Sequence, residues 1–160
     1  MKKRGFPLKI KKAEEREIDR ILSGLRKDPM VLKMKSFRQH GKVSTYEHCN
    51  SVMRLSYCLD KRFGSKADKE TLLKGAMLHD FYLYDWHHKD NGTHDWHGFI
   101  HADRALKNAE KYFNINDRVR DVIFSHMWPL NILRLPKSRE AWIVCLADKC
   151  VSLYESVFLR

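Results

Sequence analysis

The sequence predicts an all-α fold, a compact bundle of about six to eight helices. Apolar residues recur at the three- and four-residue spacing of amphipathic helices along most of the chain, and no segment shows a convincing strand pattern. Histidines and aspartates that can bind a metal recur roughly every 20 to 30 residues, about the length of one helix and its connection. The 160 residues suffice for one globular domain without disulfides.

The first 40 residues differ from the rest in charge. The formal net charge is +11, and +9 of it lies in residues 1–42, which hold fourteen Lys or Arg against five Asp or Glu. We therefore expect residues 1–40 to form a basic N-terminal helical extension and residues 41–160 to form one globular unit. The extension can contact phosphate groups of a nucleic acid or a polyphosphorylated ligand. The alternative is that these charges form a solvated helix face, which is what such a run usually is.

Two helices are expected in this extension. Residues 12–27 carry one apolar stripe on a charged helix, and Asp28-Pro29 ends it. A short helix follows to about Phe37, and His40-Gly41 then breaks the chain.

The next helix begins at a capping box. Ser44 is the N-cap, and Glu47 three residues later can reach back to its backbone. The helix runs to about Phe63, with His48 in its first turn on the apolar face. We expect this histidine to point toward the core.

The doublet His79-Asp80 ends an apolar helix that spans about residues 68–79. A carboxylate buried there costs several kcal/mol unless it is paired or bound to a metal. The doublet therefore indicates a metal site.

Residues 81–100 are aromatic and rich in His and Asp, with a turn at Asn91-Gly92. We expect a loop that leaves the metal site, and loops of this length in compact domains usually carry function. Asp85 and His97 are the residues of this loop that we assign to catalysis.

Histidines also begin and end the next two helices. His101 opens a helix that ends near Phe113, where it can reach inward. Asp117 is expected to cap a helix that ends at His126, ahead of Pro129.

The last helix starts near Ser138 and is apolar on most sides. Asp148 is embedded in it and therefore needs a cation. A metal or Lys149 could supply one, but adjacent positions on a helix do not face each other. We prefer the metal.

These side chains form one expected metal centre with ligands His48, His79, Asp80, His101, His126 and Asp148. Imidazole and carboxylate together suit first-row divalent ions, whereas calcium takes only oxygen and structural zinc usually takes thiolates. We expect one or two divalent ions, and the ligand types do not distinguish Mn, Fe, Mg, Ni, Co and Zn.

The order of these residues resembles the HD superfamily of metal-dependent phosphohydrolases, from about residue 40 to residue 155. His79-Asp80, in the stretch KGAMLHDF, is similar to the doublet that names the family. The stretch HADRAL resembles the motif whose histidine, here His101, ligates a second metal in dinuclear members. His97-Gly98 is a competing match to that motif. The resemblance implies an HD-type metal-dependent phosphohydrolase domain over residues 41–160.

Metal-assisted hydrolysis of a phosphate ester or anhydride is the function that we expect. Asp80 can bridge two metals, Lys149 is assigned to a nonbridging phosphate oxygen, and Asp85 or His97 to the proton of the leaving group. The substrate is expected to be a phosphorylated small molecule of nucleotide type.

Two other classes of function stay open. A di-iron oxygenase would use the same ligands with redox-active iron, and a binding module would dock on nucleic acid through its basic extension. No stretch of about 18 apolar residues predicts a membrane span, so we expect a cytoplasmic protein. The four cysteines form no C-x-x-C pair, which favours reduced thiols.

Overall fold

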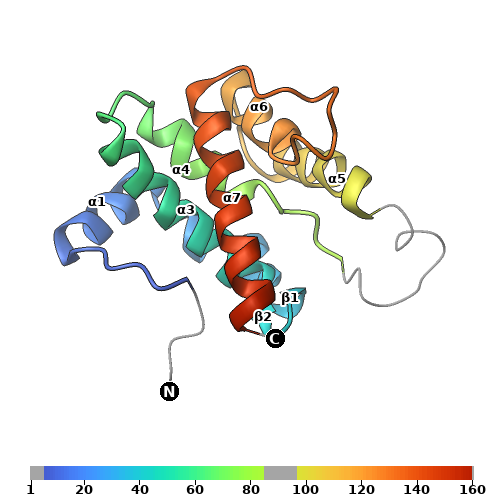
Figure 1. Ribbon diagram of the computed structural model, residues 1–160, viewed down its shortest axis with the longest axis horizontal. Coiled ribbons are helices and arrows are strands. Elements are labelled where there is room, and N and C mark those ends of the chain that lie inside the picture. Colours follow the sequence, from blue (N-terminus) through green and yellow to red (C-terminus); the bar gives the residue numbers. More distant parts are fainter. Residues whose placement is uncertain (1–5, 85–96, 160) are drawn as a thin grey trace.

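The computed structural model describes residues 6–84 and 97–159 and confirms the all-α prediction (Figure 1). The described α-helices are α1 (Lys12–Leu22), α2 (Pro29–Leu32), α3 (Thr45–Arg62), α4 (Lys69–Leu78), α5 (His97–Tyr112), α6 (Asp117–Ser125) and α7 (Arg139–Phe158). Two 3-10 helices, η1 (Leu25–Lys27) and η2 (Lys33–Ser36), flank α2, and β1 (Arg38–His40) pairs antiparallel with β2 (Val43–Ser44).

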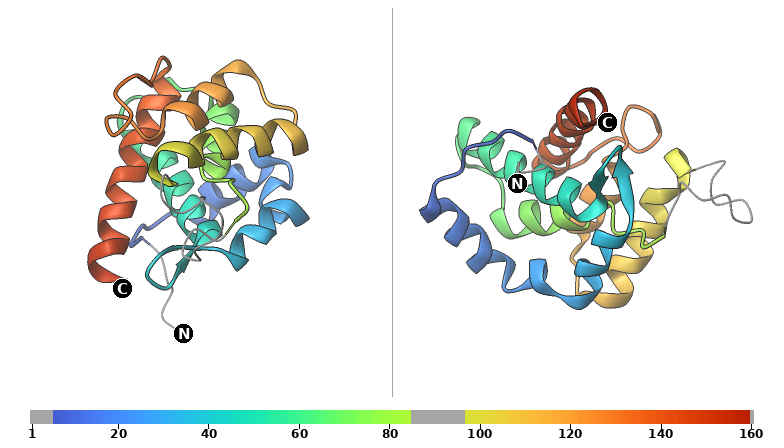
Figure 2. Two further views of the ribbon diagram at one scale, coloured as in Figure 1. Left: turned by 90° about the vertical axis from the view of Figure 1, so that its right-hand side faces the viewer. Right: turned by 90° about the horizontal axis from the view of Figure 1, so that it is seen from below.

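Helix α4 lies at the centre of the bundle. It packs against α1, α3, α6 and α7, while α5 packs on α6 (Figures 1 and 2). Helix α7 crosses α3, α4 and α6 along one edge of the molecule. Helices α1, α3, α6 and α7 thus surround α4.

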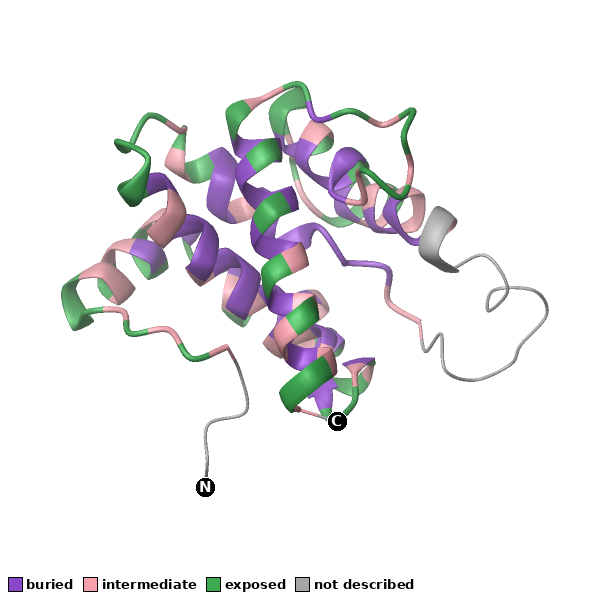
Figure 3. Ribbon diagram, in the orientation of Figure 1, coloured by how far each residue is buried: buried purple, intermediate pink, exposed green. Residues whose placement is uncertain are grey.

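Buried apolar side chains from every long helix form the core, and purple inner faces in Figure 3 mark them. Ile18 of α1 and Met34 of η2 are fully buried in the same core as Leu73 of α4. None of the helices that the structure describes is long and apolar enough to cross a membrane.

The start of the chain differs from the expected pair of helices. Helix α1 ends at Leu22 because Ser23 and Gly24 have φ of 46° and 88°, which is left-handed backbone that ends a helix. The short hairpin of β1 and β2 was not expected at all. It turns at Gly41, which has φ of 55°.

Helix starts agree with the expected caps in one place and differ in two. Ser44 and Glu47 form the predicted capping box at α3, with Glu47 N to Ser44 Oγ at 3.2 Å. The cap of α6 is Asn116, whose side chain accepts from Val119 N, rather than the predicted Asp117. Helix α5 begins at His97, so His101 lies one turn inside it and not at its start.

Close approach of α4 and α6 depends on a glycine. A Cβ placed on Gly75 of α4 would lie 2.7 Å from Cγ1 of Val122 and 2.8 Å from its Cβ. Val122 is fully buried, so it has little room to move. Gly75 therefore sets how near the two helices lie. The two helices end at His79 and His126, which are two of the predicted metal ligands.

We expect Gly75→Ala to lower the free energy of unfolding by about 1–3 kcal/mol, because the added methyl overpacks the helix contact. Urea denaturation of the variant measures this loss. The matched test is Val122→Ala, which removes the opposing methyl groups. The double variant should lose less than the sum of the two single losses, and strict additivity would contradict the contact.

Candidate metal centre

All six predicted ligands meet in one buried cluster. They come from the first turn of α3 (His48), the end of α4 (His79 and Asp80), α5 (His101), the end of α6 (His126) and α7 (Asp148). None has more than 5% of its surface exposed. The bundle therefore gathers residues a hundred positions apart in the sequence, as the one-ligand-per-helix pattern predicted.

Asp80 lies between two groups of imidazoles. Its Oδ2 is 3.4 Å from His79 Nε2 and 3.7 Å from His48 Nε2. Its Oδ1 is 3.3 Å from His101 Nε2 and 3.4 Å from His126 Nε2. One carboxylate thus offers a separate oxygen to each group.

Asp148 completes the first group, and the two remaining histidines form the second. Asp148 Oδ1 lies 3.1 Å from His48 Nε2 and 3.8 Å from His79 Nε2. His101 Nε2 and His126 Nε2 lie 3.0 Å apart. The ligand atoms of His48, His79 and Asp148 lie within 4.8 Å of one another, and so do those of His79, Asp80 and His126, which suits coordination of an ion.

Helix ends set the tautomers of two histidines. His79 Nδ1 lies 2.7 Å from the carbonyl oxygen of Ala76, and His126 Nδ1 lies 2.7 Å from that of Ile123. A carbonyl only accepts, so each Nδ1 is the donor and each Nε2 faces the cluster. Those are the nitrogens that a metal would bind.

Glu155 holds the third histidine and was missed in the sequence. Its Oε2 accepts from His48 Nδ1 at 2.8 Å, which orients His48 Nε2 toward Asp148. A carboxylate behind a ligating histidine is a common feature of metal sites. Glu155 follows Asp148 by seven residues on α7, so helical periodicity alone places both on one face.

Gln39 of the hairpin contacts the cluster, and this contact was also not predicted. Its Nε2 donates to Asp80 Oδ2 at 2.6 Å, and its Oε1 accepts from the Tyr82 hydroxyl at 2.5 Å. The Tyr82 hydroxyl also lies 3.1 Å from Thr45 Oγ1. These bonds orient the Asp80 carboxylate from the side opposite Oδ1.

Burial and the crowded charges shift the acid–base properties of the cluster. Burial alone would lower the pKa of His48, but hydrogen bonds to Asp148 and Glu155 raise it to about 10. Burial lowers the pKa of His126 to about 4, which keeps its ring neutral at pH 7. Burial works against ionisation of Asp80, yet the charge of His79 holds the pKa of that carboxyl well below its usual range.

Two buried polar atoms of the cluster lack a hydrogen-bond partner among the described residues. They are Oδ1 of Asp80 and Nε2 of His79. Unpaired buried polar atoms are rare and costly, and both point into the space that the imidazoles surround. The donor set and these two atoms therefore fit a bound cation.

Lys149 differs from its expected position. Its Nζ lies 2.9 Å from Asp148 Oδ2 and donates to the carbonyl of His126 at 2.7 Å. The long side chain bends back to its neighbour, a contact that the helix-face argument made the less favoured of the two alternatives. Its role toward phosphate stays a prediction. Asp85 lies outside the described residues, and for His97 the structure describes only a backbone position, the first residue of α5.

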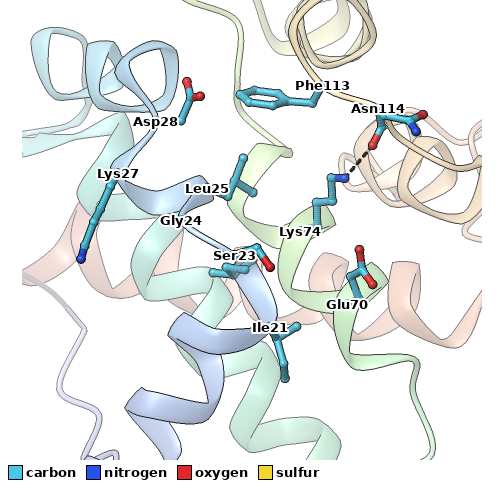
Figure 4. A pocket seen from close by; sticks show the side chains of 11 residues that line it. Ile21, Ser23, Gly24, Leu25, Lys27, Asp28, Glu70, Lys74, Phe113 and Asn114 are labelled. Atoms are coloured by element: carbon cyan, nitrogen blue, oxygen red, sulfur yellow. Dashed lines mark hydrogen bonds between the residues drawn. The ribbon is translucent and has the colours of Figure 1, made fainter.

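A surface cleft of about 390 Å³ lies apart from the cluster, between α4, the turn after α1 and the turn after α5 (Figure 4). Lys74 Nζ crosses it to the carbonyl of Asn114 at 2.6 Å. Glu70 and Asp28 line it together with Lys27, so its charges are mixed. None of the six cluster residues lines it, and it adds nothing to the metal centre.

We expect Glu155→Gln to weaken metal binding about 10- to 100-fold, because the amide holds His48 less strongly than the carboxylate does. Isothermal titration of metal-free protein with Mn²⁺ or Zn²⁺ measures the change. Glu70→Gln is the matched control, since Glu70 is an exposed glutamate outside the cluster. Equal affinities for the two variants would contradict the orienting role.

Metal binding should release protons and strengthen as the pH rises from 7 to 9. In the metal-free protein the pKa of His48 is raised to about 10. Burial would lower the pKa of His79, but Cys49, Asp80 and Asp148 together raise it well above its usual value. Both rings are therefore protonated near neutral pH, and an ion must displace those protons. Because the folded protein raises the pKa of His48 and His79, their protonation stabilises the metal-free fold. This stabilisation is complete below about pH 6.5 and is lost as the pH approaches 10.

Titration in buffers with different ionisation enthalpies counts the released protons. Heat that is independent of the buffer would show that no proton leaves and would contradict the prediction. The melting-temperature difference between loaded and metal-free protein should grow over the same pH interval.

Comparison with known proteins agrees with this geometry. The sequence pattern of the HD domain family matches residues 45–153, which include all six cluster residues as well as Lys149. No curated protein and no solved structure matches the chain. Since the match spans more than half of the sequence, this chain is a member of the HD domain family.

Proposed function

We propose that this protein is a metal-dependent phosphohydrolase with two divalent ions. The observation that carries the proposal is the position of Asp80, whose two oxygens face two separate groups of imidazoles at 3.3–3.7 Å. Membership of the HD domain family supports the same class of reaction. Which ion is native is left to the experiment, because His and Asp ligands accept several.

The residues fall into two ligand sets joined by Asp80. His48, His79 and Asp148 would hold one ion through the first set, and His101 and His126 would hold the other. Two ions in such a site activate a water for attack and neutralise charge that develops on the phosphoryl oxygens.

The surrounding residues orient and enclose these ligands. Glu155 holds His48, Gln39 holds Asp80, and the carbonyl oxygens at the ends of α4 and α6 hold His79 and His126. Burial of the cluster limits access of bulk water, which strengthens every charge interaction within it.

Lys149 is proposed to bind a nonbridging phosphate oxygen. Its side chain is 38% exposed, and its ammonium lies at the rim of the cluster against Asp148. Asp85 or His97 is proposed to protonate the leaving group, since both belong to the segment that follows the His79-Asp80 doublet in the sequence.

We propose that the substrate of this reaction is of nucleotide type. Tyr84 lies near the cluster, because the centre of its ring is 4.9 Å from that of Tyr82, with the two rings tilted at 57°, and the Tyr82 ring in turn lies 6.1 Å from that of His101. The guanidinium of Arg104 lies 4.7 Å from the centre of the Tyr84 ring. An aromatic ring and an arginine beside a metal centre suit a base and a phosphate. The net charge of +11 favours an anionic substrate.

Metal-stripped protein, reloaded singly with Mn²⁺, Fe²⁺, Mg²⁺, Ni²⁺, Co²⁺ or Zn²⁺, should hydrolyse at least one of a panel of nucleoside mono-, di- and polyphosphates, cyclic nucleotides and a chromogenic diester. Asp80→Ala should lower that turnover by about 1,000-fold or more, because both ions lose a shared ligand. Release of inorganic phosphate or of the chromophore measures both, and for cyclic nucleotides, whose hydrolysis leaves the phosphate on the nucleoside, chromatography of the monophosphate product does.

Two variants control this test. Asp19→Ala removes an exposed aspartate on α1 and should keep full turnover, and Asp80→Asn keeps the shape of the buried side chain. Metal binding without turnover in any combination would overturn the hydrolytic proposal. Oxygen consumption by the iron-loaded protein would then point to an oxygenase.

A further inference from the structure

Helix α7 turns an apolar face toward solvent. The exposed residues between positions 142 and 157 are Trp142, Leu146, Cys150, Leu153 and Val157. Leu153 is 68% exposed and Val157 57%. Their spacing of four, four, three and four residues places them in one stripe. Figure 3 shows exposed positions along the outer side of this helix, and Figure 2 shows α7 at the edge of the molecule.

The same helix is apolar on its inner side as well. Val144, Ala147 and Val151 are fully buried against the bundle. A helix that is apolar on both sides is normally buried on both sides. Among the described elements, none covers the outer face of α7.

The exposed surface extends beyond the helix. The rings of Trp128 and Trp142 lie 5.0 Å apart and join the stripe to the segment before α7. That segment exposes four more large apolar side chains, Leu130, Ile132, Leu133 and Leu135. A groove of about 820 Å³ runs beside Trp142 and Leu146, and Phe63 also lines it. Surfaces of this kind on a soluble protein mark an interaction site.

We propose that a second copy of this chain covers the stripe, with the two α7 helices antiparallel about a twofold axis between Lys149 and Cys150. The stripe is symmetric about that point. An antiparallel pair sets Trp142 opposite the partner's Val157, and Leu146 opposite the partner's Leu153. Each large residue meets an apolar residue, which is the self-complementarity that a twofold interface requires.

Charge and area agree with this arrangement. Lys149 lies near the axis, but its ammonium turns inward to Asp148 and to the carbonyl of His126. Two free ammonium groups therefore do not meet. Nine large exposed apolar side chains per copy suffice for the centre of an interface that buries about 800 Å² per partner: four of the stripe without Cys150, four of the segment before α7, and Phe158. The groove beside Trp142 lies where the last turn of the partner's helix would end.

Sedimentation velocity over a range of protein concentrations tests the association. We expect a dimer at micromolar concentration, and Leu146→Glu or Leu153→Lys alone should raise the dissociation constant roughly 10- to 100-fold. Because the pairing sets position 146 against position 153, the double variant should regain most of the affinity through two Glu–Lys contacts. Both positions are exposed, so circular dichroism spectra should match the wild type. Melting curves should match it at protein concentrations where every variant and the wild type are monomeric.

Cysteine cross-linking tests the axis independently. Helices in contact lie about 8–10 Å apart, so a short bis-maleimide should join Cys150 of the two copies into a covalent dimer. Cys49 and Cys145 are buried and Cys58 is partly buried, so Cys150 is the expected site. Cys150→Ser should abolish the product, and Cys58→Ser should keep it. A monomer at all concentrations overturns the proposal. A dimer that the single variants do not weaken, or that the double variant does not restore, overturns it as well.

Discussion

The carboxylate of Asp80 is the point on which the cluster depends. It is buried, it is surrounded by four imidazoles, and one of its oxygens lacks a hydrogen-bond partner within the described residues. Such a group is unfavourable in a protein interior unless a cation or protons balance it. The helices that deliver the four histidines are also those that make the core. Folding and the chemistry of the centre therefore rest on the same contacts.

Support for the ligands comes from parts of the chain far apart in sequence. Glu155 near the end of α7 holds His48 at the start of α3, and Gln39 of the hairpin holds Asp80. These bonds leave each ligand few ways to rotate. A site that is ordered before an ion arrives loses less conformational entropy on binding.

Much of the fold and of the centre could be predicted from the sequence, since helical spacing and side-chain chemistry are local signals. The capping box at Ser44 placed His48 in a first turn, and burial of the His79-Asp80 doublet followed from the apolar residues before it. The hairpin could not be predicted, because its strands of three and two residues are too short to show alternation. The early start of α5 was missed because Gly98 in its first turn disfavours a helix. The bend of Lys149 toward Asp148 depends on tertiary packing, which helix geometry alone does not contain.

The hydrogen bond from Gln39 to Asp80 affects how short a segment of this protein can be and still contain the complete centre. The family pattern begins at residue 45, yet Gln39 lies six residues before it and donates directly to the central carboxylate. A segment cut at the family boundary would keep all six ligands and lose the amide that orients Asp80. The part of the chain that matches the family pattern is therefore shorter than the part that orients the central carboxylate, and the smallest complete unit begins at or before Gln39.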